Sequence, residues 1–256
     1  MKNFTSKHSK KNNQATITRR NFLNTGMAAA TFSLATGVTL MAYASNNDKV
    51  SGKTSRWGLL IDVNKCKSDC NDCVKACSNE NGWELSEENS KTDAQWIRKI
   101  DLKEMASGRE ISLPLMCQHC ESPPCVDVCP TGASFKRSDG IVLVDKHICI
   151  GCRYCMMACP FKARSFIHGK VPESQKKSGS PRGKGVVESC TMCVHLVDEG
   201  GTPACAIACT QTGNEAILFG DLYDPNSEIS IRLATYQSSA LRDDLQLNPS
   251  IRYQNF

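Results

Sequence analysis

The chain has 256 residues, of which 16 are cysteine and only 6% are aromatic, and its formal net charge is +5. That length suffices for one or two domains with a core of their own. The positive charge lies at the start of the chain: residues 1–44 hold six basic residues and no acidic one, and the remaining 25 basic and 26 acidic residues leave a net charge of −1. We therefore expect no nucleic-acid binding by the main part of the chain.

Residues 1–44 have the order of parts found in an export signal. Twin arginines, Arg19 and Arg20, stand in "TRRNFLNTG", an uncharged stretch follows, and "AYA" at 42–44 is a small-x-small cleavage pattern. This resembles a twin-arginine (Tat) signal peptide, with Asn24 in place of the usual lysine. Threonine, serine and glycine dilute the apolar stretch, which disfavours a retained span of about 20 apolar residues. We expect the Tat translocase to export the folded chain, which then begins near Ser45 in the periplasm.

The cysteines form four groups of four, and every group ends in a C-x3-C spacing. The groups are Cys66, Cys70, Cys73 and Cys77; Cys117, Cys120, Cys125 and Cys129; Cys149, Cys152, Cys155 and Cys159; and Cys190, Cys193, Cys205 and Cys209. An exported cysteine-rich chain usually suggests disulfides. Tetrahedral zinc usually takes two C-x2-C pairs from separated strands. Three cysteines in a tight loop instead match an iron–sulfur cubane, whose irons each need one outer thiolate.

The third group, "CIGCRYCMMACP", has the C-x2-C-x2-C-x3-C-P spacing of bacterial ferredoxins, in which the fourth cysteine binds the other cluster. If Cys155 to Cys159 forms one helical turn, it advances about 6 Å along the helix axis. The proline after Cys159 opposes simple continuation of that helix. The spacing therefore predicts that Cys159 leaves its own group. Sixteen thiolates at four per cluster predict four [4Fe–4S] clusters.

Strand patterns precede the groups: "WGLLIDV" from Trp57, "ISLPLM" from Ile111, "GIVLV" from Gly140 and "GVV" from Gly185. Asp139-Gly140 before Ile141 predicts a β-hairpin between the second and third groups. If those two groups pair, the first and fourth must pair around them. The predicted fold class is α+β, with two nested bacterial-ferredoxin-like modules of short strands and helices around four [4Fe–4S] clusters, and long loop insertions.

The segment from about Trp57 to Ser230 resembles the four-cluster iron–sulfur subunit family of dimethyl sulfoxide reductase. "CQHCESPPCVDVCPTGA" and "CIGCRYCMMACPF" carry the resemblance, and "GDLYDPNSEIS" supports it. "ACSNENGW" and "QWIRKI" are most similar to the DsrO type, the periplasmic iron–sulfur subunits of the DsrMKJOP membrane complexes of sulfur-metabolising bacteria.

The resemblance implies one ligand set for each of four clusters, with one cysteine of every set taken from another group. The sets are Cys149, Cys152, Cys155 with Cys129; Cys117, Cys120, Cys125 with Cys159; Cys66, Cys70, Cys73 with Cys209; and Cys190, Cys193, Cys205 with Cys77. The wide spacing from Cys66 to Cys70 departs from the commonest pattern of the family.

The resulting organisation is a Tat signal at 1–44 and a four-cluster iron–sulfur domain at 45–256. Within it we expect an inner module at about 111–168 and an outer module at about 57–110 plus 185–222. Residues 223–256 are expected to form a tail that contacts a partner. Asn226 or Ser227 can cap a short helix there, and the last stretch, "NPSIRYQNF", has no core pattern. His119, inside the second group, is expected in solvent rather than against a cluster. Trp83 is expected to pack rather than to relay electrons.

The predicted function is electron transfer between a membrane quinone-interacting subunit of the NrfD type and another redox subunit, such as a multihaem cytochrome c, in dissimilatory sulfur metabolism. We expect no catalytic site of its own, since every cysteine is a predicted ligand and no dinucleotide loop or haem-attachment motif is present. The alternatives are the same role in a periplasmic molybdoenzyme or a quinol-linked nitrite reductase, and a structural zinc protein. Membrane contact is expected only through a partner.

Replacing Arg19 and Arg20 together by lysine should leave the uncleaved precursor in the cytoplasm, because the twin arginines are the recognised part of a Tat signal. Cell fractionation and immunoblotting measure this. The matched control is Lys10→Arg with Lys11→Arg, which should be exported like the unaltered chain. Normal export of the twin-lysine variant would refute the assignment.

Overall fold

The computed structural model describes residues 29–35, 38–43, 55–84 and 92–256, in two units, residues 1–51 and 52–256. In the first unit, β1 (Ala29–Ala35) and β2 (Val38–Tyr43) form an antiparallel pair in which Ala29 lies opposite Tyr43. The twin arginines and Ser45 lie outside the described residues. Within the described ranges, no helix is long and apolar enough to cross a membrane.

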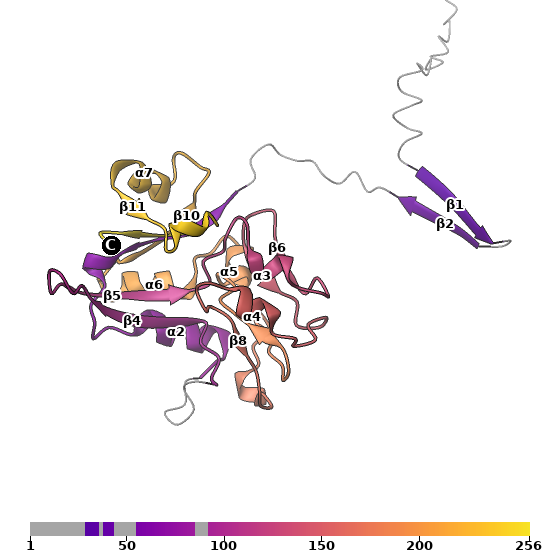
Figure 1. The fold of residues 1–256 in the computed structure, drawn as a ribbon, viewed down its shortest axis with the longest axis horizontal. Coiled ribbons are helices and arrows are strands. Elements are labelled where there is room, and N and C mark those ends of the chain that lie inside the picture. The colour runs from indigo at the N-terminus through magenta and orange to yellow at the C-terminus, as the bar shows by residue number, and fades with distance from the viewer. Residues whose placement is uncertain (1–28, 36–37, 44–54, 85–91) are drawn as a thin grey trace, which may run out of the picture. The chain divides into compact units, whose positions relative to one another are not determined.

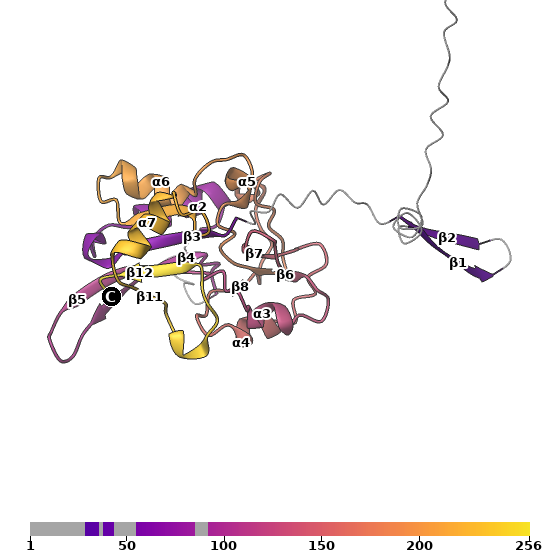
Figure 2. The ribbon, with the colours of Figure 1, turned by 90° about the horizontal axis from the view of Figure 1, so that it is seen from above.

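The main sheet of the second unit is built around β3 (Trp57–Asp62), which lies between β10 (Ile217–Asp221) and β12 (Ile251–Gln254) (Figures 1 and 2). β10 pairs with β3 antiparallel and β12 pairs with it parallel, while β11 (Ser238–Ser239) lies beyond β12. The run "GLLID" is buried throughout, as a strand covered on both faces requires. This sheet joins the segment before the first cysteine group to the segment after the fourth.

Within residues 55–84 and 92–256, three two-stranded ribbons accompany the main sheet. They pair β4 (Ile97–Lys103) with β5 (Glu110–Met116), β6 (Ser134–Lys136) with β7 (Val142–Val144), and β8 (Ser165–Phe166) with β9 (Val187–Glu188). The predicted hairpin between the second and third groups is thus confirmed. Gly140 has φ 86°, a left-handed conformation that glycine adopts without the usual steric cost.

Short helices carry or follow the cysteine loops. They are α2 (Asp72–Asn81), α3 (Pro124–Asp127), α4 (Tyr154–Ala158), α5 (Val194–Val197), α6 (Ala204–Gln211) and α7 (Glu228–Thr235), with 3-10 turns at η1 (Val63–Lys65), η2 (Glu173–Gln175) and η3 (Asp243–Leu245). α2 packs beside α6, and α3 packs beside α4. Ser227 caps α7 by accepting a hydrogen bond from the Ser230 N–H, so one of the two expected caps is the correct one.

The C-terminal tail differs from the expectation that it has no core pattern. Ile251 and Tyr253 are both 0% exposed, and β12 pairs with the central strand β3. The Tyr253 hydroxyl donates to the Pro114 carbonyl (3.0 Å) and accepts from the Gln118 side-chain amide (3.3 Å). Four residues are too few for alternation to mark a core strand, which is why the pattern was missed. Partner contact by the rest of residues 223–256 stays a prediction.

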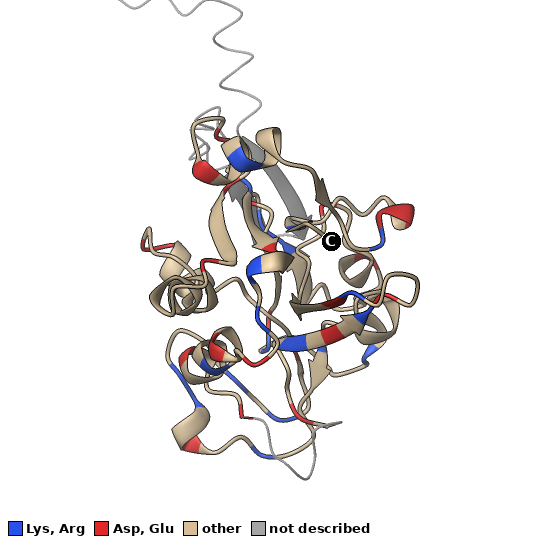
Figure 3. Cartoon of the chain, turned by 90° about the vertical axis from the view of Figure 1, so that its left-hand side faces the viewer, with Lys and Arg blue, Asp and Glu red and all other residues tan. Residues whose placement is uncertain are grey.

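Basic and acidic residues alternate along the ribbon of the second unit, without a large region of one sign (Figure 3). The buried residues instead gather around the cysteines, in a cluster that includes Leu59, Trp83, Trp96 and Met116 together with Cys77. The helices and strands therefore pack around cysteine side chains as well as around other apolar side chains.

Ile251→Ala should lower the free energy of unfolding by about 2–5 kcal/mol, because it leaves a cavity beside the central strand. The midpoint of anaerobic denaturant unfolding measures the loss. Ile231→Ala is the matched control: its side chain is 53% exposed, so the same truncation should change stability by no more than about 0.5 kcal/mol. Equal effects of the two variants would contradict the core role of the tail.

Candidate iron–sulfur centres

Two helices bring the first and fourth cysteine groups together. Cys73 and Cys77 lie one turn apart on α2, and Cys205 and Cys209 lie one turn apart on α6. Cys73 lies near Cys209, and Cys77 near Cys205, so the two packed helices run in opposite directions. Each helix therefore offers one thiol to each of two cavities, about 6 Å apart along the helix axis.

The first of these cavities, site A, is lined by Cys66, Cys70, Cys73 and Cys209, together with Pro114, Asn214 and Ala216. The Ala216 N–H donates to the Cys209 sulfur (3.2 Å), and the Asn214 side-chain amide donates to the Cys70 sulfur (3.5 Å). The loop from Cys66 to Cys70 is further held by Lys99, whose ammonium donates to the Cys70 carbonyl (2.5 Å). The wide first spacing therefore still brings Cys66, Cys70 and Cys73 to one cavity.

The second cavity, site B, is lined by Cys77, Cys190, Cys193 and Cys205, with Trp96 and Met116. Trp83 Nε1 donates to the Cys77 sulfur (3.4 Å), and the Asn81 amide lies 3.6 Å from the same sulfur and 3.9 Å from that of Cys193. Donors of this kind stabilise negative charge on sulfur. Trp83 was expected only to pack; it is fully buried and also supplies a hydrogen bond.

The second and third groups meet through α3 and α4, which pack together. Site C is formed by Cys117, Cys120, Cys125 and Cys159: the first, second and last share one buried cluster with Phe161 and Ala163, and Cys125 lies within electrostatic range of Cys159. α4 ends at Ala158, and Cys159 follows it in an extended conformation.

Site D is a cavity lined by Cys129, Cys149, Cys152 and Cys155. Burial acts to raise the pKa of Cys129, but hydrogen bonds from Ser134 and Thr131 outweigh it and hold the pKa below its usual value. The Ser134 N–H lies 3.3 Å from the Cys129 sulfur. The cavities of sites A, B and D are thus each lined by four cysteines, while Cys125, assigned to site C, packs in a buried cluster with Cys155 of site D. The four ligand sets that the family resemblance implies stay a prediction.

Burial dominates the acidity of most of these thiols. It raises the pKa of Cys73, Cys117 and Cys120 to about 12 and shifts those of Cys77, Cys190 and Cys205 upward as well. A thiol coordinated to a metal loses its proton outright. Sulfur is the donor type that binds iron in cubane clusters, so four buried thiols around one space fit such a group. No three Cys, His, Asp or Glu side chains in the described ranges converge on a single-ion site.

The four sites adjoin one another in a row. Cys73 of site A is an electrostatic neighbour of Cys205 of site B, Cys190 of site B is a neighbour of Cys117 of site C, and Cys125 of site C is a neighbour of Cys155 of site D. These electrostatic neighbours give the order A–B–C–D. Partly exposed thiols occur at both ends: Cys66 and Cys70 at site A, and Cys129, Cys149 and Cys152 at site D.

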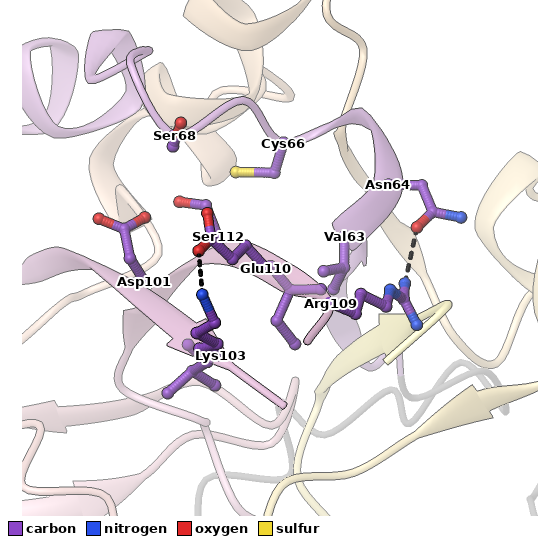
Figure 4. Close-up of a pocket in the computed structure, with 11 residues that line it drawn as sticks. Val63, Asn64, Cys66, Ser68, Asp101, Lys103, Arg109, Glu110 and Ser112 are labelled. Atoms are coloured by element: carbon purple, nitrogen blue, oxygen red, sulfur yellow. Dashed lines mark hydrogen bonds and ion pairs between the residues drawn. The ribbon is translucent and has the colours of Figure 1, made fainter. Parts of the chain in front are cut away.

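An open polar cleft of about 490 Å³ lies beside site A and includes Cys66 in its wall (Figure 4). Its other walls come from η1, β4 and β5. Across it Lys103 pairs with Glu110 (2.9 Å), and the Arg109 guanidinium donates to the Asn64 side chain (2.8 Å). The cleft gives this end of the row a charged rim.

His119 is not in solvent, as was expected, but is 1% exposed. Its Nδ1 accepts a hydrogen bond from the Val142 N–H (3.0 Å), and burial together with the nearby Arg164 charge lowers its pKa to about 3. The ring is therefore neutral with its proton on Nε2. The other two histidines near the cysteine groups differ: His195 contacts Glu80 (2.7 Å), and His147 is exposed.

Comparison with known proteins identifies the class. Residues 110–221 match the family model described as a 4Fe–4S dicluster domain. The chain is 40% identical to the Hdr-like menaquinol oxidoreductase iron–sulfur subunit 1 of Archaeoglobus fulgidus, over 93% of this chain and 97% of that one. It is 38% identical to a putative dimethyl sulfoxide reductase iron–sulfur subunit from Halobacterium salinarum, over 78% and 79% of the two chains, and 36% identical to protein NrfC of Escherichia coli, over 76% and 81%.

The chain is therefore an iron–sulfur protein with a ferredoxin-type 4Fe–4S domain. In particular, it belongs to the family of iron–sulfur subunits of oxidoreductase complexes to which these relatives belong.

Iron removal should destabilise the chain, and more strongly at low pH. The free thiols have raised pKa values, about 12 for Cys73 and Cys117, so each thiol loses a proton on binding iron and regains it when iron leaves. Iron loss takes up protons, and a fall in pH therefore favours it. With an anaerobic chelator, visible absorbance should bleach faster at about pH 5 than at about pH 8, and the thermal midpoint of the bleached protein should be lower. An unchanged midpoint after complete iron loss would contradict this.

Proposed function

We propose that this chain is an electron-transfer subunit that binds four [4Fe–4S] clusters, one in each of sites A, B, C and D. The observation that carries the proposal is the row of adjoining sites: the cavities of sites A, B and D are each lined by four cysteines, Cys117, Cys120 and Cys159 share the buried cluster of site C, and both ends of the row have partly exposed thiols. A bound [4Fe–4S] cluster supplies one-electron oxidation and reduction.

In this proposal the residues of the chain bind the clusters, exclude water from them and adjust their reduction potentials. The sixteen thiolates hold iron, and the apolar side chains around sites B and C keep water from them. Hydrogen bonds from Trp83 and Asn81 at site B and from Ser134 at site D stabilise negative charge on the ligating sulfurs, which favours the reduced state. No catalytic role is assigned to the chain itself.

Electrons enter at one end of the row and leave at the other. The similarity to a menaquinol oxidoreductase subunit favours a membrane partner that exchanges electrons with a quinone, for which an NrfD-type integral subunit is our candidate. A second redox subunit, such as a multihaem cytochrome c, would dock at the opposite end. We assign the chain to a DsrO-type position in a DsrMKJOP-type complex of sulfur metabolism.

The proposed location is the periplasmic face of the inner membrane. It rests on the twin-arginine pattern of Arg19 and Arg20 and on the small-x-small pattern "AYA" at 42–44. The inner module at about 111–168, nested within the outer one, is supported by the β6–β7 hairpin and by the β3–β10 pairing around it.

A molybdoenzyme or a quinol-linked nitrite reductase would use the same row of clusters, and similarity to a dimethyl sulfoxide reductase subunit and to NrfC favours these as second candidates. Co-purification from the native membrane, followed by identification of the redox subunits, distinguishes the three complexes. Metal analysis separates all of them from a structural zinc protein: the proposal requires roughly sixteen iron atoms per chain. Zinc in place of iron would refute it.

Ligand exchange between the second and third groups is tested by Cys159→Ser. This change should alter or remove the cluster of site C, because Cys159 adjoins Cys117 and Cys120, while the site D cluster keeps four thiolates. Electron paramagnetic resonance with redox titration makes the comparison: the signal affected in Cys159→Ser should be the one affected in Cys120→Ser.

Cys129→Ser is the reciprocal variant and should affect the same signal as Cys152→Ser. If Cys159→Ser instead perturbs the signal lost in Cys152→Ser and spares the one lost in Cys120→Ser, each group holds its own cluster. The nested ligand sets would then be wrong.

A further inference from the structure

Arg164 is buried without a partner for its charge. It lies between α4 and β8, and the residue is 5% exposed. Its Nε, Nη1 and Nη2 atoms are all inaccessible, and in the described ranges none pairs with a carboxylate; the polar groups close to the guanidinium are the sulfurs of Cys125 and Cys155. Burying an unpaired cation is among the most costly arrangements in a protein interior. Such a side chain needs a negative group beside it.

A second buried arginine, Arg182, has a carboxylate partner and serves as a comparison. Arg182 pairs with Glu188 (3.0 Å), the two side chains are 4% and 0% exposed, and Trp96 Nε1 also donates to Glu188 (3.1 Å). Arg164 has no such carboxylate. Its charged neighbours are thiols, Cys117 and Cys125 of site C and Cys155 of site D.

The position of Arg164 fits two clusters at once. It lines the site D cavity and lies within electrostatic range of two thiols of site C. Its guanidinium, which stays protonated in proteins, is therefore a fixed cation beside the sulfurs of Cys117, Cys125 and Cys155. His119 Nε2, which carries the ring proton, is a second buried donor here without a partner. Both donors are buried beside the cysteines of sites C and D, where the sulfur atoms of a bound cluster would be acceptors.

We propose that Arg164 raises the reduction potentials of the clusters in sites C and D and leaves those in sites A and B unchanged. The inference deepens the proposed function and rests on it. Reduction adds negative charge to a group already bound by four thiolates, and a fixed cation in a low-dielectric interior stabilises the reduced form more than the oxidised form. Arg164 thereby biases electrons toward the C–D end of the row.

The experiment is an anaerobic redox titration, followed by electron paramagnetic resonance, of the iron-loaded full chain. Arg164→Gln keeps an amide donor and removes the charge, Arg164→Lys keeps the charge without the guanidinium plane, and Lys162→Met removes an exposed charge from the same segment. The signals of sites C and D are those affected by Cys120→Ser and Cys152→Ser.

In Arg164→Gln the equilibrium constant for reduction of the site C and D clusters should fall at least tenfold. For a one-electron couple, a tenfold fall lowers the reduction potential by about 59 mV. Arg164→Lys should retain at least half of that stabilisation, and Lys162→Met should match the unaltered chain. Because the site A and B signals are recorded in the same sample, a general loss of folding would move all four and overturn the proposal.

Unchanged site C and D potentials in an Arg164→Gln protein of full iron content would also overturn it, as would an equal shift in Lys162→Met. If Arg164→Gln loses iron, Arg164→Lys decides: full iron with near-normal potentials supports the charge, and loss of iron there too refutes it in favour of a packing role. An unaltered chain with fewer than four clusters is instead a failure of the proposed function.

Discussion

The second unit depends on cysteines that lie one helical turn apart on short helices packed side by side. On α2 and α6 the two cysteines of each helix belong to different cavities, so neither helix can leave without opening both sites. The helices have 10 and 8 residues, too few to be stable alone in water. Their stability must therefore come from packing against each other and from the two sites that they share. The β3–β10 pairing joins the chain before α2 to the chain after α6, and so also holds the two helices together.

This constraint explains why cysteines are part of the main hydrophobic cluster. Several fully buried side chains, Trp83, Trp96 and Met116 among them, lie against site B rather than in a layer of their own. The same side-chain contacts therefore both pack this region and fix the positions of the thiols. A substitution that shifts one of these side chains would move a thiol, and a lost thiol would leave its apolar neighbours facing an open space.

Spacing was sufficient to predict the parts of the fold that depend on neighbouring residues. The hairpin at Asp139-Gly140 follows from turn chemistry. The helical turn expected from Cys155 to Cys159 does not form, because α4 ends at Ala158 and Cys159 is extended; Cys159 nevertheless packs with Cys117 and Cys120. The sequence could not place β12, because four residues carry too little periodicity and the pairing partner lies nearly two hundred positions away. The burial of His119 and Arg164 could not be predicted for a related reason. Polar residues are usually exposed, and only the assembled fold reveals that these two are enclosed.

The two ends of the row present different surfaces, which bears on how an electron carrier distinguishes its partners. At site A the cleft beside Cys66 has charged walls that include Asp101, Lys103 and Glu110. At site D the cysteine loop and α4 expose Ile150 (67%), Tyr154 (53%) and Met157 (67%). Charged rims favour steering and salt-dependent encounter, whereas exposed apolar side chains favour a longer-lived contact. A row with a charged surface at one end and an apolar surface at the other would bind its partners in one orientation. The charge of Arg164 would then favour electron movement in one defined direction between the two partners.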